Sequence, residues 1–100
     1  MIHILLIAHP ALSDTQGQYL AFIHAYTIVI GRPPAEADLQ RHFRVTPPSV
    51  HQMILTLERQ ALIKRQPGTA RSVQVIVDPA DLPPLRPVGA QPVKSSVPSY

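Results

Sequence analysis

The 100-residue sequence contains no cysteine, and this absence excludes two kinds of protein. Without cysteine there is neither a disulfide framework nor a thiolate ligand for a metal ion. A reducing compartment fits this composition, so we expect the protein to act in the cytoplasm.

Long hydrophobic stretches are also missing. The apolar segment from Met1 to Ala8 is far too short to span a membrane, lacks a basic leader and is followed by Pro10. We therefore predict no membrane segment. Residues 1–12 are interpreted as an apolar N-terminal extension that forms an extra strand, a dimer contact or a frayed end, in preference to a cleaved signal peptide.

The residue patterns on which catalysis and metal binding depend are absent as well. The five histidines include no His-x-x-x-His pair, and His24, His42 and His51 have no acidic or cysteine neighbours at ligand spacing. Ser49 and Ser72 lie outside any Gly-x-Ser-x-Gly context, and there is no glycine-rich phosphate loop. We therefore expect no enzyme activity, no metal site, no cofactor and no small-molecule substrate.

Proline is abundant, but its distribution is uneven. Six of the twelve prolines fall within residues 79–100, where no apolar period is visible. Such a composition is typical of disordered or loosely packed chain. The length suffices for a single small core, so we predict one folded domain over residues 13–78 and a disordered tail over residues 79–100.

Two helices are expected in the first half of this domain. Ser13 and Gln16 match a capping box, and apolar residues then recur at three- and four-residue steps up to Gly31. These residues are Tyr19, Phe22, Ile23, Tyr26 and Ile30. Pro33 prevents continuation of the helix, and Pro34 suits the first turn of a second, short helix over residues 35–43.

A third helix and a hairpin complete the pattern. Thr46 is placed to cap the third helix, whose buried stripe is expected to consist of Val50, Met53, Ile54, Leu57 and Ala61. Residues 62–65 and 71–77 then have the features of strands on either side of a Pro-Gly turn. The predicted fold class is therefore α+β, mainly α: a winged helix-turn-helix of three helices and a two-stranded β-hairpin wing.

Positive charge is concentrated in the second half of the domain. Residues 39–77 contain one acidic side chain, Glu58, and six basic ones: Arg41, Arg44, Arg59, Lys64, Arg65 and Arg71. This asymmetry favours a polyanionic partner, although a basic face can also simply be solvated.

In a winged helix the third helix fits the DNA major groove and the wing contacts the backbone or the minor groove. The candidate base contacts are Thr46, Ser49, His51 and Gln52. The Gln52 amide can pair with adenine, and His51 can donate to guanine or phosphate. The candidate wing and backbone contacts are Arg44, Lys64, Arg65, Thr69 and Arg71.

The same residues resemble the DNA-binding domain of LexA-type repressors. The similarity lies in Gly31-Arg32-Pro33-Pro34, in the segments 46–53 and 57–59, and in the wing segment 67–73. The third helix is also similar to that of MarR and DtxR regulators. The resemblance implies sequence-specific double-stranded DNA binding for transcriptional control. Recognition would then lie with Thr46, Pro48, Ser49, His51 and Gln52.

The sequence departs from that family in three respects. LexA repressors have a second domain, a self-cleaving Ser-Lys peptidase that also dimerises them, and we do not expect the residues after Val77 to supply it. The family has acidic or amide side chains where this chain has His51 and Gln52, so its operator is not carried over. Ala61 stands where relatives often have glycine, at a cost of about 1 kcal/mol if φ is positive there.

The main alternative is a winged helix that binds another protein and has no DNA readout. RNA is a weaker candidate, because the deep, narrow major groove of A-form RNA does not suit an exposed recognition helix. One small domain reads a short sequence, so we expect a homodimer, with residues 1–12 as the candidate contact.

Overall fold

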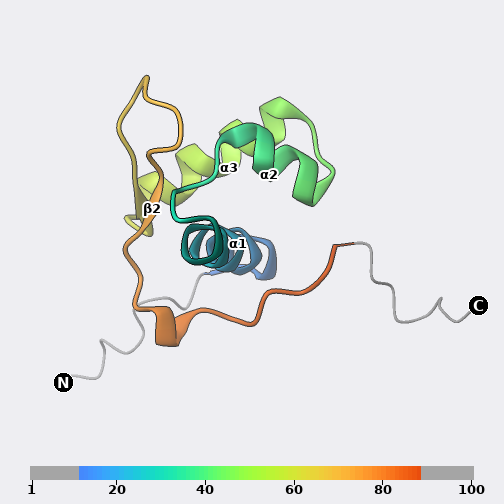
Figure 1. Cartoon of the computed structure of the whole chain (residues 1–100), viewed down its shortest axis with the longest axis vertical. Coiled ribbons are helices and arrows are strands. Elements are labelled where there is room, and N and C mark those ends of the chain that lie inside the picture. Colours follow the sequence, from blue (N-terminus) through green and yellow to red (C-terminus); the bar gives the residue numbers. More distant parts are fainter. Residues whose placement is uncertain (1–11, 89–100) are drawn as a thin grey trace, which may run out of the picture.

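The computed structural model describes residues 12–88. Its elements are α1 (Asp14–Ile30), α2 (Glu36–Phe43), α3 (Pro47–Arg59), β1 (Ile63–Lys64), β2 (Gln74–Val75) and η2 (Pro79–Asp81). In Figure 1, α2 and α3 lie over α1, and the loop between β1 and β2 projects beside them. The predicted winged helix-turn-helix is confirmed. The predicted N-terminal extension lies outside the described residues, apart from Leu12.

Both ends of α1 have the expected caps. The Ser13 hydroxyl accepts a hydrogen bond from the Gln16 amide at 3.1 Å, and the Gln16 side chain accepts one from the Ser13 amide at 3.0 Å. Gly31 ends the helix in the left-handed region, with φ 89°. The capping box and the glycine stop are therefore as the sequence predicts.

The short turn between α2 and α3 has a cap at each of its two ends. Arg44 closes α2 with φ 57°, and the Thr46 hydroxyl caps α3 by accepting from the Ser49 amide at 3.3 Å. Pro34 differs from the prediction: it precedes the Ala35 N-cap of α2 and is buried in the core instead of forming the first turn.

One hydrophobic core joins the helices to the wing. Its buried members are Tyr19, Leu20, Ile23, Leu39, Val50, Ile54, Leu57, Leu62, Ile63, Val73 and Val77. The stripe on α3 is as predicted at Val50, Ile54 and Leu57. Ile30 continues the apolar spacing of α1, but it is 51% exposed and does not join the core. It lies in the last turn of α1, beyond the part of that helix that packs on the core.

The wing strands are shorter than predicted. β1 and β2 pair in antiparallel fashion through only two residue pairs, Ile63 with Val75 and Lys64 with Gln74. Their flanking residues Leu62, Val73 and Val77 are nevertheless buried. The apolar alternation therefore marks which side chains enter the core, and not how far the strand ladder extends.

The end of α3 also differs from the prediction. Ala61 is exposed and has φ 62°. The Ala61 amide donates to the Glu58 carbonyl and the Leu62 amide to the Leu57 carbonyl, both at 3.0 Å. This is the Schellman pattern, in which the left-handed position normally favours glycine.

We expect Ala61→Gly to raise the free energy of unfolding by about 1 kcal/mol, because glycine adopts positive φ without the steric cost of a Cβ. Urea denaturation followed by circular dichroism would measure the change. The control is Ala37→Gly at an exposed position in the first turn of α2, which should lower stability by at most about 0.5–1 kcal/mol. A loss of stability in both variants would contradict the strain at residue 61.

An aromatic cluster links α1 to α2. Tyr19 stacks on Phe43 with ring centroids 4.2 Å apart, and His42 stacks on Phe22 at 4.2 Å. The Nε2 atom of His42 is buried and has no hydrogen-bond partner among residues 12–88. Burial lowers the pKa of His42 below its usual value of 6.5.

This lowered pKa predicts a loss of stability in mild acid. Between the folded pKa and 6.5 the unfolded chain binds more protons at His42 than the folded protein does. The His42 contribution is therefore complete above pH 6.5 and is lost as the pH falls below it. We expect His42→Leu to flatten this part of the stability curve, measured by urea denaturation at a series of pH values. Parallel curves for the variant and the wild type would contradict this assignment.

Residues 79–88 form an ordered strap along α1, although the sequence predicted disorder from residue 79 (Figure 1). The buried Gln18 side chain donates to the Pro84 carbonyl at 2.9 Å and accepts from the Arg86 amide at 2.8 Å. Arg86 also forms a two-pronged ion pair with Asp14, at 3.0 and 2.6 Å. The prediction is therefore wrong for residues 79–88, and residues 89–100 lie outside the described part.

Within residues 12–88, no helix combines the length and the apolar character that crossing a membrane requires.

Candidate nucleic-acid interface

The start of α3 presents polar side chains away from the core. Thr46, Pro48, Ser49, His51 and Gln52 are all exposed. The Thr46 hydroxyl is engaged in the helix cap, since it also donates to the Ser49 hydroxyl at 3.0 Å. The Ser49 hydroxyl keeps its own proton available for donation. The five predicted recognition residues therefore share one accessible end of the helix.

Gln52 lies at this end of α3 with its side-chain amide open to an external partner. No hydrogen bond within residues 12–88 engages its amide. It lines a shallow hollow of about 480 Å³ between the start of α1 and α3, together with Ser13, Gln16, Pro48, Ser49, Met53 and Thr56. The amide can thus offer a donor and an acceptor together to one external partner.

His51 has a partner that the sequence analysis missed. Its Nδ1 atom lies 3.3 Å from the Glu36 carboxylate in the first turn of α2. The two side chains are 51% and 40% exposed, respectively. Glu36 therefore orients the imidazole and also places a negative charge beside the recognition helix.

The wing loop is held in shape by Ser72. The Ser72 hydroxyl accepts from the Gln66 amide at 2.9 Å and lies 2.9 Å from the Thr69 carbonyl. Gly68 provides the turn with φ 77°, and Thr69 is exposed in the loop. This serine thus has a structural explanation that needs no catalytic role.

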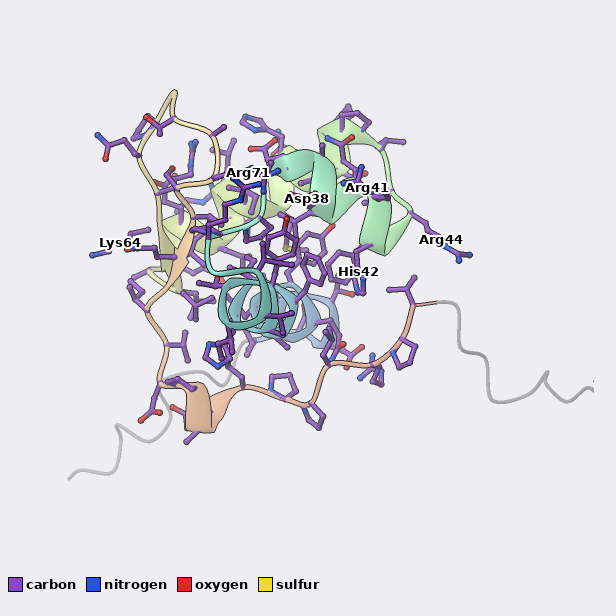
Figure 2. All side chains as sticks on the ribbon, viewed as in Figure 1. Asp38, Arg41, His42, Arg44, Lys64 and Arg71 are labelled. Atoms are coloured by element: carbon purple, nitrogen blue, oxygen red, sulfur yellow. The ribbon has the colours of Figure 1, made fainter. Side chains whose placement is uncertain are left out.

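Two of the predicted wing cations are engaged by carboxylates of the domain itself. Arg65 donates from Nε to Glu58 on α3 at 3.0 Å. Arg71 donates from Nη1 to Asp38 on α2 at 3.0 Å, and its side chain is 33% exposed. Figure 2 shows Arg71 beside Asp38, between the wing and α2. Both guanidinium groups thus have a carboxylate partner that the sequence analysis did not identify, and their contact with DNA stays a prediction.

The other two cations project outward. Arg44 extends from the end of α2 and Lys64 from β1, and they lie at opposite edges of the domain in Figure 2. Both are exposed, and neither forms an ion pair with any of residues 12–88. Arg44 and Lys64 are therefore available for contacts outside the domain.

A second hollow, of about 400 Å³, separates the recognition helix from the wing. Its lining includes Glu36 and His51 on one side and Thr69 and Arg71 on the other. Of the predicted recognition residues, His51 faces this opening together with the wing loop, whereas Pro48, Ser49 and Gln52 line the hollow beside α1.

A short helix-turn-helix, an exposed polar face on its second helix and an adjacent wing define the class: this is a winged helix-turn-helix domain. In agreement, residues 9–72 match the family described as LexA DNA binding domain. The chain therefore belongs to this family of DNA-binding domains.

Several LexA repressors are similar to it. The chain is 34% identical to that of Thermosipho africanus over 68 residues, which is 68% of this chain and 34% of the relative. It is 32% identical to that of Thermosipho melanesiensis over 65 residues, covering 65% and 33% of the two chains. For Bartonella quintana the identity is 35% over 66 residues, covering 65% and 28%. The chain thus spans about a third of the length of these relatives.

Proposed function

We propose that the protein binds double-stranded DNA at a specific sequence and thereby regulates transcription, as a repressor related to LexA. The observation that supports this most directly is the exposed polar start of α3 next to the wing, in a domain that belongs to a DNA-binding family. A helix of this kind fits the major groove, and its first turns reach the base edges.

The proposed contacts follow from the positions of the side chains. Gln52 pairs with a base, and His51 and Ser49 add donors to bases or phosphates. Thr46 and Pro48 hold the start of α3 close to the DNA backbone. Lys64 and Thr69 contact phosphates through the wing, and Arg44 does so on the other side of the recognition helix.

We further propose a homodimer that binds two half-sites. A pair of small domains binds DNA more tightly than one domain and reads a longer DNA sequence. Residues 1–12 are one candidate contact. The last turn of α1 is another, since Ile28 and Val29 are 67% and 80% exposed. Sedimentation equilibrium at high micromolar concentration, with and without DNA, tests this. A monomer under both conditions would argue against the dimer.

The proposed action is binding alone, without catalysis or a cofactor, in the cytoplasm. The decisive experiment measures fluorescence anisotropy with a random duplex pool at two salt concentrations, followed by selection and sequencing of the bound DNA. Phosphate contacts predict that affinity falls steeply with salt, and base contacts predict enrichment of a short motif. Absence of binding at low salt would reject the proposal and favour a winged helix that binds another protein.

A further inference from the structure

We propose that Arg71 and Asp38 act as a pair that sets the position of the wing relative to the recognition helix, and that Arg71 is a positioning residue and not a phosphate contact. This inference rests on the proposed DNA binding for its effect on affinity. Its effect on the wing itself does not depend on any ligand.

The Asp38 carboxylate joins three parts of the domain. Its Oδ2 atom accepts from the Ala35 amide at 2.8 Å, from the Tyr26 hydroxyl at 3.3 Å and from Arg71 Nη1 at 3.0 Å. Its Oδ1 atom accepts from Arg41 at 2.6 Å. The donors thus come from α1, from the start of α2 and from the wing, and they converge on one carboxylate whose side chain is only 11% exposed.

The other contacts of Arg71 also connect the wing to the helices. Besides Asp38, its Nη1 atom donates to the Tyr26 hydroxyl at 3.2 Å and lies 3.4 Å from the Pro33 carbonyl. The backbone at Arg71 has φ 55°, a conformation that costs energy for a residue other than glycine. This conformation places the guanidinium against α1 and α2 while the chain turns back toward β2.

The wing needs such an attachment because its sheet is minimal. A hairpin with two residue pairs has little stability of its own. The Ser72 bonds stay within the loop and do not connect it to the helices. Arg65 attaches the first limb of the wing to Glu58 on α3, and Arg71 attaches the second limb to Asp38 on α2.

Hydrogen bonds and neighbouring charges keep both Asp38 and Arg71 ionised. The Ala35 amide is the largest cause that lowers the pKa of Asp38 below 3.8, and Arg71 lowers it further. The Tyr26 hydroxyl and Asp38 in turn raise the pKa of Arg71. Both groups are ionised at neutral pH and partly withdrawn from water. The loss of Asp38 leaves Arg71 without its carboxylate partner, and the loss of Arg71 removes one of the two arginines that pair with Asp38.

The direction in which Asp38→Asn changes DNA affinity distinguishes a positioning role of Arg71 from a phosphate contact. Asp38→Asn removes a negative charge from a DNA-binding domain, so electrostatics alone predicts tighter binding to the selected duplex. If Asp38 instead holds the wing through Arg71, the same change weakens binding by roughly threefold or more. Arg71→Lys adds a second test. Lysine keeps the positive charge that a phosphate contact needs, but it lacks the planar guanidinium group that bonds Asp38.

The experiment compares wild type, Asp38→Asn, Arg71→Lys and the double variant by anisotropy, each shown by circular dichroism to be folded. We expect both single variants to weaken binding and the double variant to be no weaker than the worse single one. Tighter binding by Asp38→Asn, full binding by Arg71→Lys, or losses that add in the double variant would each overturn the proposal.

A second measurement needs no DNA. Amide hydrogen exchange of residues 66–72 should become faster in Asp38→Asn and in Arg71→Lys, because the wing loses its attachment. Arg41→Met is the matched control, since Arg41 also bonds Asp38 but is 72% exposed and does not touch the wing. Unchanged wing exchange in both test variants would overturn the proposal. If wild type itself fails to bind DNA, only the proposed function fails, and the exchange data still decide the role of the pair.

Discussion

We expect Gln52→Ala to lower discrimination at one base pair of the selected DNA site by roughly 1–3 kcal/mol, or about 5- to 150-fold. The Gln52 amide is exposed and unpaired within residues 12–88, so it can form two hydrogen bonds to one base without first breaking internal ones. Affinity for random duplex should change little, because that affinity comes from phosphate contacts.

Competition binding measures this effect, with the selected duplex and a set of duplexes that each differ from it at one base pair. The matched control is Gln60→Ala, since Gln60 is an exposed glutamine at the opposite end of α3. The control should keep the full discrimination of the wild type. An equal loss of affinity by Gln52→Ala for every duplex would show that this side chain contacts the backbone and does not distinguish bases.

The elements that depend on local chemistry could be predicted from the sequence. Ser13, Gly31 and Thr46 act on atoms at most four residues away, and such contacts leave a recognisable spacing. The exposed polar face of α3 was predictable for a related reason. Once Val50, Ile54 and Leu57 are assigned to the buried stripe of α3, the periodicity of the helix leaves its polar residues outside.

The wing cations could not be placed in this way. Arg71 is separated from Asp38 by 33 residues and from Tyr26 by 45, so no local spacing connects them. Their charges were visible, but a basic residue near a turn has the same sequence signal whether it meets DNA or an internal carboxylate. One hint was present: Tyr26 places a hydroxyl in an apolar stripe, and a buried tyrosine hydroxyl usually requires a polar partner.

The strap could not be predicted, because proline content and a missing apolar period describe the segment itself and not the surface that binds it. A proline-rich segment that forms no ladder of its own still has free carbonyl groups, and a buried glutamine can bind such a chain through both ends of its amide. Gln18 does so with Pro84 and Arg86, 66 and 68 residues away. Composition indicates that such a segment cannot form a core, but it does not show whether an existing core has a surface that binds it.

The substitution with the largest expected effect on folding lies on the same helix as Gln52 but on its other face. Leu57 is fully buried, and Leu57→Ala should lower the free energy of unfolding by about 2–5 kcal/mol, because it leaves a cavity in the core. That loss is a large part of the roughly 5–15 kcal/mol that stabilises a typical domain. Urea denaturation measures it.

The control for this prediction is Leu85→Ala, the same truncation at a position that is 37% exposed on the strap, which should cost much less. Because Leu57 stabilises α3 without facing the polar end of the helix, the folded fraction of Leu57→Ala should retain the base preference of the wild type. Gln52→Ala should do the opposite and keep stability while losing preference. If Leu57→Ala changed the preferred base while fully folded, the core face and the recognition face of α3 would not be separable, and the assignment of readout to the exposed face alone would be wrong.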